Sequence, residues 1–117
     1  MKQLLSLILC AAALPALADD PLIETVSAQP SGDTWQFNVT LSHPDSGWDH
    51  YADGWRVLDM DGNVLGWRVL VHPHEHEQPF TRSLSDVQIP GDIKQVQIQA
   101  RCLTDGWGTQ TYTFTLP

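Results

Sequence analysis

Hydrophobic and polar residues alternate along most of the chain beyond its N-terminal segment. The clearest example is 34–42, where Trp35, Phe37, Val39 and Leu41 alternate with polar residues. A period of two is typical of a β-strand that buries one face. Similar runs predict strands at 23–28, 54–59, 64–71, 80–84, 87–89, 94–101 and 110–116.

Turn-forming residues separate these runs. The segment Gly-Trp-Arg-Val-Leu occurs at 54–58 and again at 66–70, with Asp61-Gly62 between the two copies. Asp-Gly between two strand patterns favours a tight β-hairpin, because such turns need positive φ. Short strands without a helical period predict an all-β fold, namely an immunoglobulin- or fibronectin-like antiparallel β-sandwich of about seven strands.

The first eighteen residues have the pattern of an export signal. Lys2 precedes an apolar run at 4–14, and Ala16-Leu17-Ala18 forms a small-x-small cleavage site. The apolar run is too short for a good membrane span. We therefore predict a signal peptide at 1–18, a single domain at 19–117 and a periplasmic or secreted location without a membrane span.

Charge narrows the range of partners. The chain has 14 acidic residues against 6 Lys and Arg, a net charge of -8. Nucleic acid is excluded as a partner, because there is no basic surface to neutralise phosphates. A metal cation is electrostatically favoured. We expect a monomer or a weak dimer.

Three of the five histidines, His72, His74 and His76, occupy alternate positions. An extended backbone turns alternate side chains to one side, so the three imidazoles could converge on a metal. Pro73 and Pro79 remove backbone donors, which indicates a loop or an edge strand. The segment is either one wall of a metal site or a solvated polar loop.

The predicted sandwich gathers the other candidate ligands at the same end. The connection after 34–42, the segment after 64–71 and the connection after 94–101 all emerge at one pole of such a fold. Cys102 follows the last of these strands, and the predicted cleavage would remove the other cysteine, so no intramolecular disulfide is expected. Cys102 is either a ligand or a buried apolar residue. The predicted metal ligands are His43, His50, His72, His74, His76 and Cys102.

Several acidic residues lie near these candidates. Asp45, Asp49 and Asp53 could orient ligand imidazoles through hydrogen bonds. A site rich in imidazole with few thiolates suits zinc or copper. No catalytic group occurs at a spacing that demands turnover, so we expect metal binding, buffering or delivery.

The main alternative is an interaction module without catalytic activity. Trp48 and Trp107 fall in polar segments at the same predicted pole. Aromatic side chains there could form a platform for a protein or a sugar ligand. In that case the histidines would be incidental, or would form a pH-sensitive rim.

Two short segments resemble the iron domain of superoxide reductases of the desulfoferrodoxin and neelaredoxin type. They are His43-Pro44 followed by His50, and Cys102 followed by Asp105-Gly106-Trp107. The resemblance implies an immunoglobulin-like sandwich, ligand roles for His43, His50 and Cys102, iron as a third candidate metal, and an oxidoreductase if the chain is an enzyme. It departs from the family at Asp105, where the family has histidine, and after Pro44, where methionine is absent. The segment 72–76 has no counterpart in the family.

The stretch 43–84 also resembles a group of small exported bacterial proteins without an assigned function. The shared segments are His-Pro-Asp and Gly-Trp-Asp-His-Tyr-Ala-Asp-Gly-Trp, followed by Glu-Gln-Pro-Phe-Thr-Arg. This second resemblance implies export and a similar fold, and it specifies no chemistry.

Overall fold

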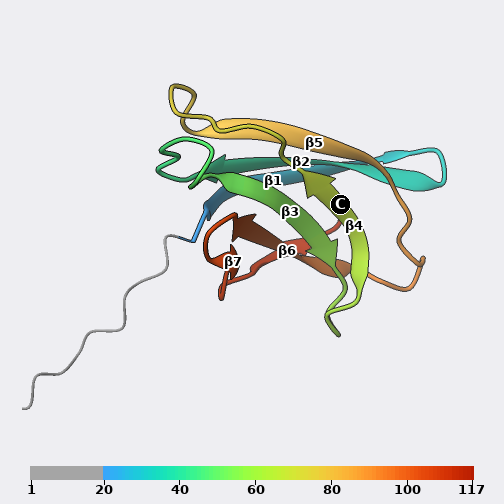
Figure 1. Ribbon diagram of the computed structural model, residues 1–117. Coiled ribbons are helices and arrows are strands. Elements are labelled where there is room, and N and C mark those ends of the chain that lie inside the picture. Colours follow the sequence, from blue (N-terminus) through green and yellow to red (C-terminus); the bar gives the residue numbers. More distant parts are fainter. Residues whose placement is uncertain (1–19) are drawn as a thin grey trace, which may run out of the picture.

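Two antiparallel β-sheets pack face to face in the computed structural model, which describes residues 20–117 (Figure 1). The first sheet has the strand order β1-β2-β5, formed by β1 (Leu22–Ser31), β2 (Thr34–Ser42) and β5 (Phe80–Val87). The second has the order β4-β3-β6-β7, and β8 also pairs with β6; its strands are β3 (Ala52–Leu58), β4 (Val64–Val69), β6 (Gln95–Cys102), β7 (Gly106–Trp107) and β8 (Tyr112–Thr115). The predicted all-β sandwich is confirmed.

The segment 1–18, predicted to be a signal peptide, lies outside the described residues. Within residues 20–117, no helix is long and apolar enough to cross a membrane.

The core lies between the two sheets and follows the alternation seen in the sequence. Phe37, Val39 and Leu41 on β2 are fully buried, and they face a layer that contains Trp55 and Ile98. Strands β2, β3 and β6 each have partners on both sides, so their inward faces are the best covered. Burial of these apolar side chains supplies the main driving force for the fold.

Two of the predicted strands are a single strand in the structure. The segments 80–84 and 87–89 were expected to form separate strands, but β5 runs continuously from Phe80 to Val87. Asp86 adopts a φ of 60°, so the backbone turns locally, and Val87 still reaches the core beside Trp35. The break in the hydrophobic pattern therefore reflects a backbone irregularity within one strand.

Trp107 also differs from its predicted place in a loop. It belongs to β7, a two-residue strand in which Trp107 pairs with Arg101. Its ring lies 5.5 Å from that of Trp67, and the Arg56 guanidinium lies 3.8 Å from the ring centre. Such cation–π contacts and aromatic pairs stabilise a sheet face locally. A two-residue strand is too short to produce a periodic signal in the sequence.

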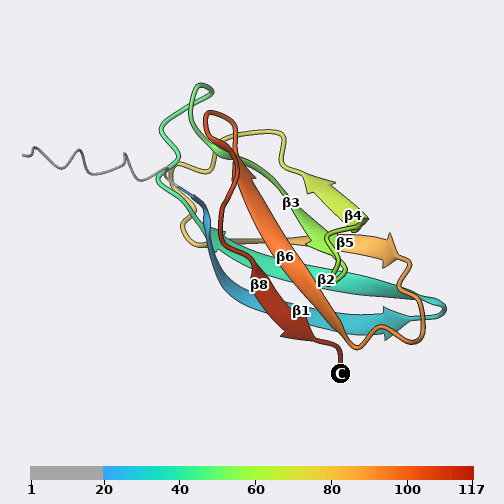
Figure 2. The ribbon, with the colours of Figure 1, turned by 90° about the horizontal axis from the view of Figure 1, so that it is seen from below.

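Three connections gather at one end of the sandwich. They join β2 to β3, β4 to β5 and β6 to β7, and both ribbon views place them together (Figures 1 and 2). In each case the chain leaves one strand at this end and returns from it to the next. The candidate ligands lie in or beside these connections.

Candidate metal centre

His43, His50 and Cys102 form a compact cluster at this end. One ligand atom from each side chain lies within 4.8 Å of the other two. Cys102 is the last residue of β6 and is fully buried, and His43 follows β2 directly and is also buried. His50 lies in the connection between β2 and β3 and is partly exposed. Among residues 20–117, no other group of three potential ligands is this close together.

Backbone and side-chain hydrogen bonds hold His50 next to Cys102. The Leu103 N–H donates to the Tyr51 carbonyl at 2.9 Å, and the Thr104 hydroxyl donates to the Asp49 carbonyl at 2.8 Å. These two bonds lie on either side of His50 in the sequence, so they fasten its loop to the end of β6. The rings of His43 and His50 meet edge to face, with centroids 4.9 Å apart.

Asp45 orients the other histidine of the cluster. Its side chain is fully buried, and Oδ1 lies 2.6 Å from Nδ1 of His43. The same carboxylate accepts hydrogen bonds from the Ala52 N–H at 3.0 Å and the His74 N–H at 2.7 Å. With Nδ1 bonded to Asp45, the buried Nε2 of His43 has no hydrogen-bond partner among the described residues. A carboxylate behind an imidazole, with the other ring nitrogen available, is the usual arrangement around a metal-binding histidine.

Gln78 joins two of the connections, and sequence reasoning missed it. Its Oε1 accepts from the His43 N–H at 3.0 Å, and its Nε2 donates to the His74 carbonyl at 2.8 Å. A glutamine beside Pro79 carries no signal of such a role in the sequence. The contact becomes apparent only when both connections are placed at the same end.

The three alternating histidines have different environments. His74 is buried and stacks on Phe80 at a centroid distance of 3.9 Å, whereas His72 and His76 are exposed. None of the three belongs to the compact group of His43, His50 and Cys102. The structure therefore separates the six predicted ligands into a buried cluster and a neighbouring loop.

Burial lowers the pKa of the His74 imidazole below its ordinary value of 6.5, and the charges of Arg82 and His72 act in the same direction. Asp45 and Glu77 oppose this effect without reversing it. The folded protein thus favours the neutral ring of His74, which is the form that can bind a metal.

This pKa shift predicts a pH-dependent stability. Below about pH 6.5 the unfolded chain protonates His74 before the folded chain does, so the unfolding free energy should fall as the pH falls through this range. Urea denaturation in the presence of a chelator, compared at about pH 7.5 and about pH 5.5, measures the change. His74→Gln should reduce the pH dependence, and His76→Gln, in the same loop, should retain that of the wild type. Equal pH dependence in all three proteins would contradict the assignment.

A shallow groove of about 320 Å³ borders the loop, lined by Gly47, Trp48, His72, Pro73, Glu75 and His76. Trp48 is 67% exposed there. Trp107 lies instead in β7, against Trp67 and beneath Arg56. The predicted platform of two loop tryptophans therefore retains only Trp48.

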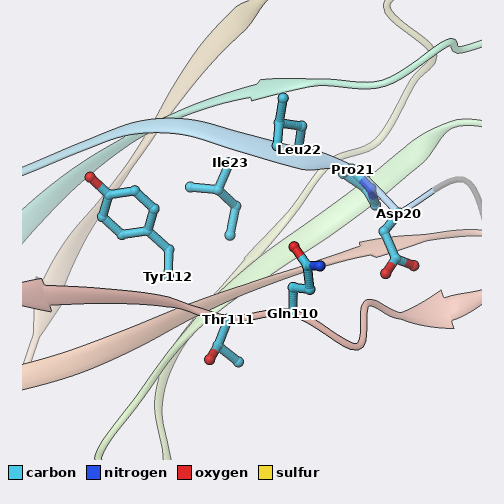
Figure 3. Close-up of a pocket in the computed structure, with 7 residues that line it drawn as sticks. All are labelled: Asp20, Pro21, Leu22, Ile23, Gln110, Thr111 and Tyr112. Atoms are coloured by element: carbon cyan, nitrogen blue, oxygen red, sulfur yellow. The ribbon is translucent and has the colours of Figure 1, made fainter.

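A second pocket, of about 150 Å³, lies where the start of β1 approaches the segment that leads into β8 (Figure 3). None of the predicted ligands lines this pocket, which is formed by Asp20, Pro21, Leu22, Ile23, Gln110, Thr111 and Tyr112. Asp20 is already engaged, because its carboxylate accepts hydrogen bonds from the backbone and hydroxyl of Thr109. The donor-rich end of the sandwich remains the better candidate site.

Comparisons with known proteins give a relative and a structural neighbour. The chain is 35% identical over 94 residues to a protein of Halomicrobium mukohataei named "Putative lipoprotein"; the match covers 80% of this chain and 46% of that protein. The chain thus spans about half the length of this relative. The crystal structure of a hypothetical protein from Pyrococcus horikoshii OT3 matches 86% of this chain and 93% of its own, with a TM-score of 0.56 and 11% identity. That likeness concerns the fold alone. No family model matches the chain.

Proposed function

We propose that this chain is an exported metal-binding protein whose site is the cluster of His43, His50 and Cys102. The observation that carries the proposal is the convergence of three ligand atoms within 4.8 Å, two from the connection between β2 and β3 and one from the distant end of β6. Asp45 supplies the supporting carboxylate, and the buried Nε2 of His43 is available to a ligand.

The donor set limits the choice of metal. Two imidazoles and one thiolate suit zinc or copper, and iron is a third candidate. Three protein ligands leave a coordination position for water or for a group from another molecule. Such an incomplete shell supports a role in binding, buffering or delivery, because the metal can be exchanged through the open position.

Export is supported by two independent features. The N-terminal residues follow the pattern of a signal peptide. The relative from Halomicrobium mukohataei carries the name of a lipoprotein, which is a class of exported protein. A periplasmic or secreted location would expose the site to the metals of that compartment.

Cys102→Ser tests the site with a minimal change of shape. The full chain is expressed without a histidine tag, stripped of metal, and titrated with Zn(II) and Cu(II) by calorimetry. The variant should bind the first equivalent at least about tenfold more weakly, since it loses the thiolate. The wild type with Cu(II) should also show a sulfur-to-copper charge-transfer band, which should be absent from the variant.

His76→Ala is the matched control, because it removes an exposed histidine outside the cluster. It should retain the wild-type affinity for the first equivalent and the charge-transfer band. Equal first-site affinity in Cys102→Ser and the wild type, with no such band in either, would refute the proposed site.

A further inference from the structure

His72 and His74 form a pair of imidazoles outside the buried cluster. Their ring centroids are 4.5 Å apart, with an interplanar angle of 42°. His74 is held in place by its stacking on Phe80 and by the bond from its backbone N–H to Asp45. His72 lies on the exposed side of the pair. One ring is therefore fixed and the other faces solvent.

The hydrogen bonds of the two rings leave nitrogen atoms available. Nδ1 of His72 lies 3.0 Å from the Pro73 carbonyl, so in the neutral ring Nδ1 carries the proton and Nε2 keeps its lone pair. Both ring nitrogens of His74 are buried without a hydrogen-bond partner among the described residues. The nearest carboxylate oxygen, Oδ2 of Asp45, lies 3.8 Å from Nδ1, beyond hydrogen-bonding distance. Buried polar atoms without a protein partner are uncommon, and a bound water or ion is one of the ways in which they are satisfied.

The surroundings favour a cation. The groove of about 320 Å³ runs past His72 and also contains Glu75. The net charge of -8 attracts cations to the protein in general.

We propose that His72 and His74 form a second metal position, weaker than the buried cluster and open to solvent at His72, which binds Cu(II) or a similar divalent transition metal. Imidazole suits these metals, and among the divalent ions of the first row copper binds such sites most tightly. The groove borders His72 but not His74, so water would complete the coordination shell from the side of His72. Asp45 connects the two positions, because one oxygen contacts His43 and the other accepts from the backbone of His74.

The second position rests on the proposed function only for the class of metal that it would bind. Experiments can therefore refute either metal position without refuting the other. Cu(II) alone is the probe, added to the full chain without a histidine tag in the Cys102→Ser background. That background lacks the thiolate and its charge-transfer band, so the remaining imidazole-bound copper can be followed by electron paramagnetic resonance and calorimetry.

In this background, adding His72→Ala should weaken the remaining copper binding at least about tenfold, because half of the pair is lost. Adding His76→Ala should change it by less than about twofold. His72 and His76 are both exposed, so neither replacement should disturb folding. The wild type should bind two coppers per chain, and His72→Ala alone should bind one while keeping the charge-transfer band.

Equal copper binding with and without His72, or an equal loss with His76→Ala, would overturn the second position. A wild type that binds only one copper, with the charge-transfer band, would overturn it as well and leave the buried cluster standing. Binding that depends on His72 without any charge-transfer band would support the second position and refute the buried one.

Discussion

Asp45→Asn should weaken metal binding at the proposed site by about 10- to 100-fold, the range found when the carboxylate behind a ligand histidine is removed. In the folded protein this carboxylate contacts the His43 ring and accepts the backbone N–H groups of Ala52 and His74. Asparagine has only one acceptor oxygen in place of two. Its NH₂ group would face the His43 ring or one of the backbone N–H groups, which are themselves donors. The His43 ring would then lose its fixed orientation.

The same substitution should lower the unfolding free energy of the metal-free protein by about 1–3 kcal/mol, because a buried donor loses its acceptor. Metal titration and urea denaturation measure the two effects separately. Asp49→Asn is the control: its side chain is exposed in the same connection, so both quantities should stay near their wild-type values. Wild-type affinity and stability in Asp45→Asn would show that the carboxylate has no part in the site.

Trp55→Ala should lower the unfolding free energy by about 3–5 kcal/mol, the usual cost of removing a large buried aromatic side chain. Trp55 is fully buried and is the largest of the fully buried side chains in residues 20–117. Strand β3, which carries it, is paired on both sides by β4 and β6, so the backbone can move little to fill the cavity. Urea denaturation followed by far-ultraviolet circular dichroism measures the loss without relying on tryptophan fluorescence.

Two variants control for size and for polarity. Trp55→Phe retains most of the volume and also removes Nε1, which is buried without a hydrogen-bond partner among the described residues; it should therefore lose less than half as much stability as Trp55→Ala. Trp48→Ala removes the same side chain from a site where it is 67% exposed, and should cost less than about 1 kcal/mol. Similar losses for Trp48→Ala and Trp55→Ala would contradict the assigned core.

The alternation of residues was sufficient to predict the sandwich, because central strands must bury every second side chain. Phe37, Val39 and Leu41 are all fully buried as their spacing indicates. Pattern alone failed where the backbone departs from a regular strand. Asp86 interrupts the alternation of β5 by its positive φ, and the two residues of β7 are held by pairing with β6 rather than by a pattern of their own.

The candidate site could be predicted in part, because the strand order expected from the sequence brings its ligands to one end of the fold. Once the strands are ordered, His43, His50 and Cys102 must end near each other, and Asp45 is close enough in sequence to His43 to support it. The division between His74 and its exposed neighbours His72 and His76 was not predictable. It depends on Phe80, which stacks on His74, and on Gln78, which joins two connections distant in the sequence.

The cluster lies between the two sheets, so a bound metal would affect the rate at which the protein unfolds. His43 follows β2 of the first sheet, and Cys102 ends β6 of the second, so an ion held between them would tie the two layers together. In antibody domains a disulfide connects the two sheets, and Cys102 is the single cysteine among residues 20–117. In the proposed holoprotein the layers could not separate before a metal–ligand bond breaks. A bound metal would thus slow unfolding and lengthen the lifetime of the folded protein where no chaperone can refold it.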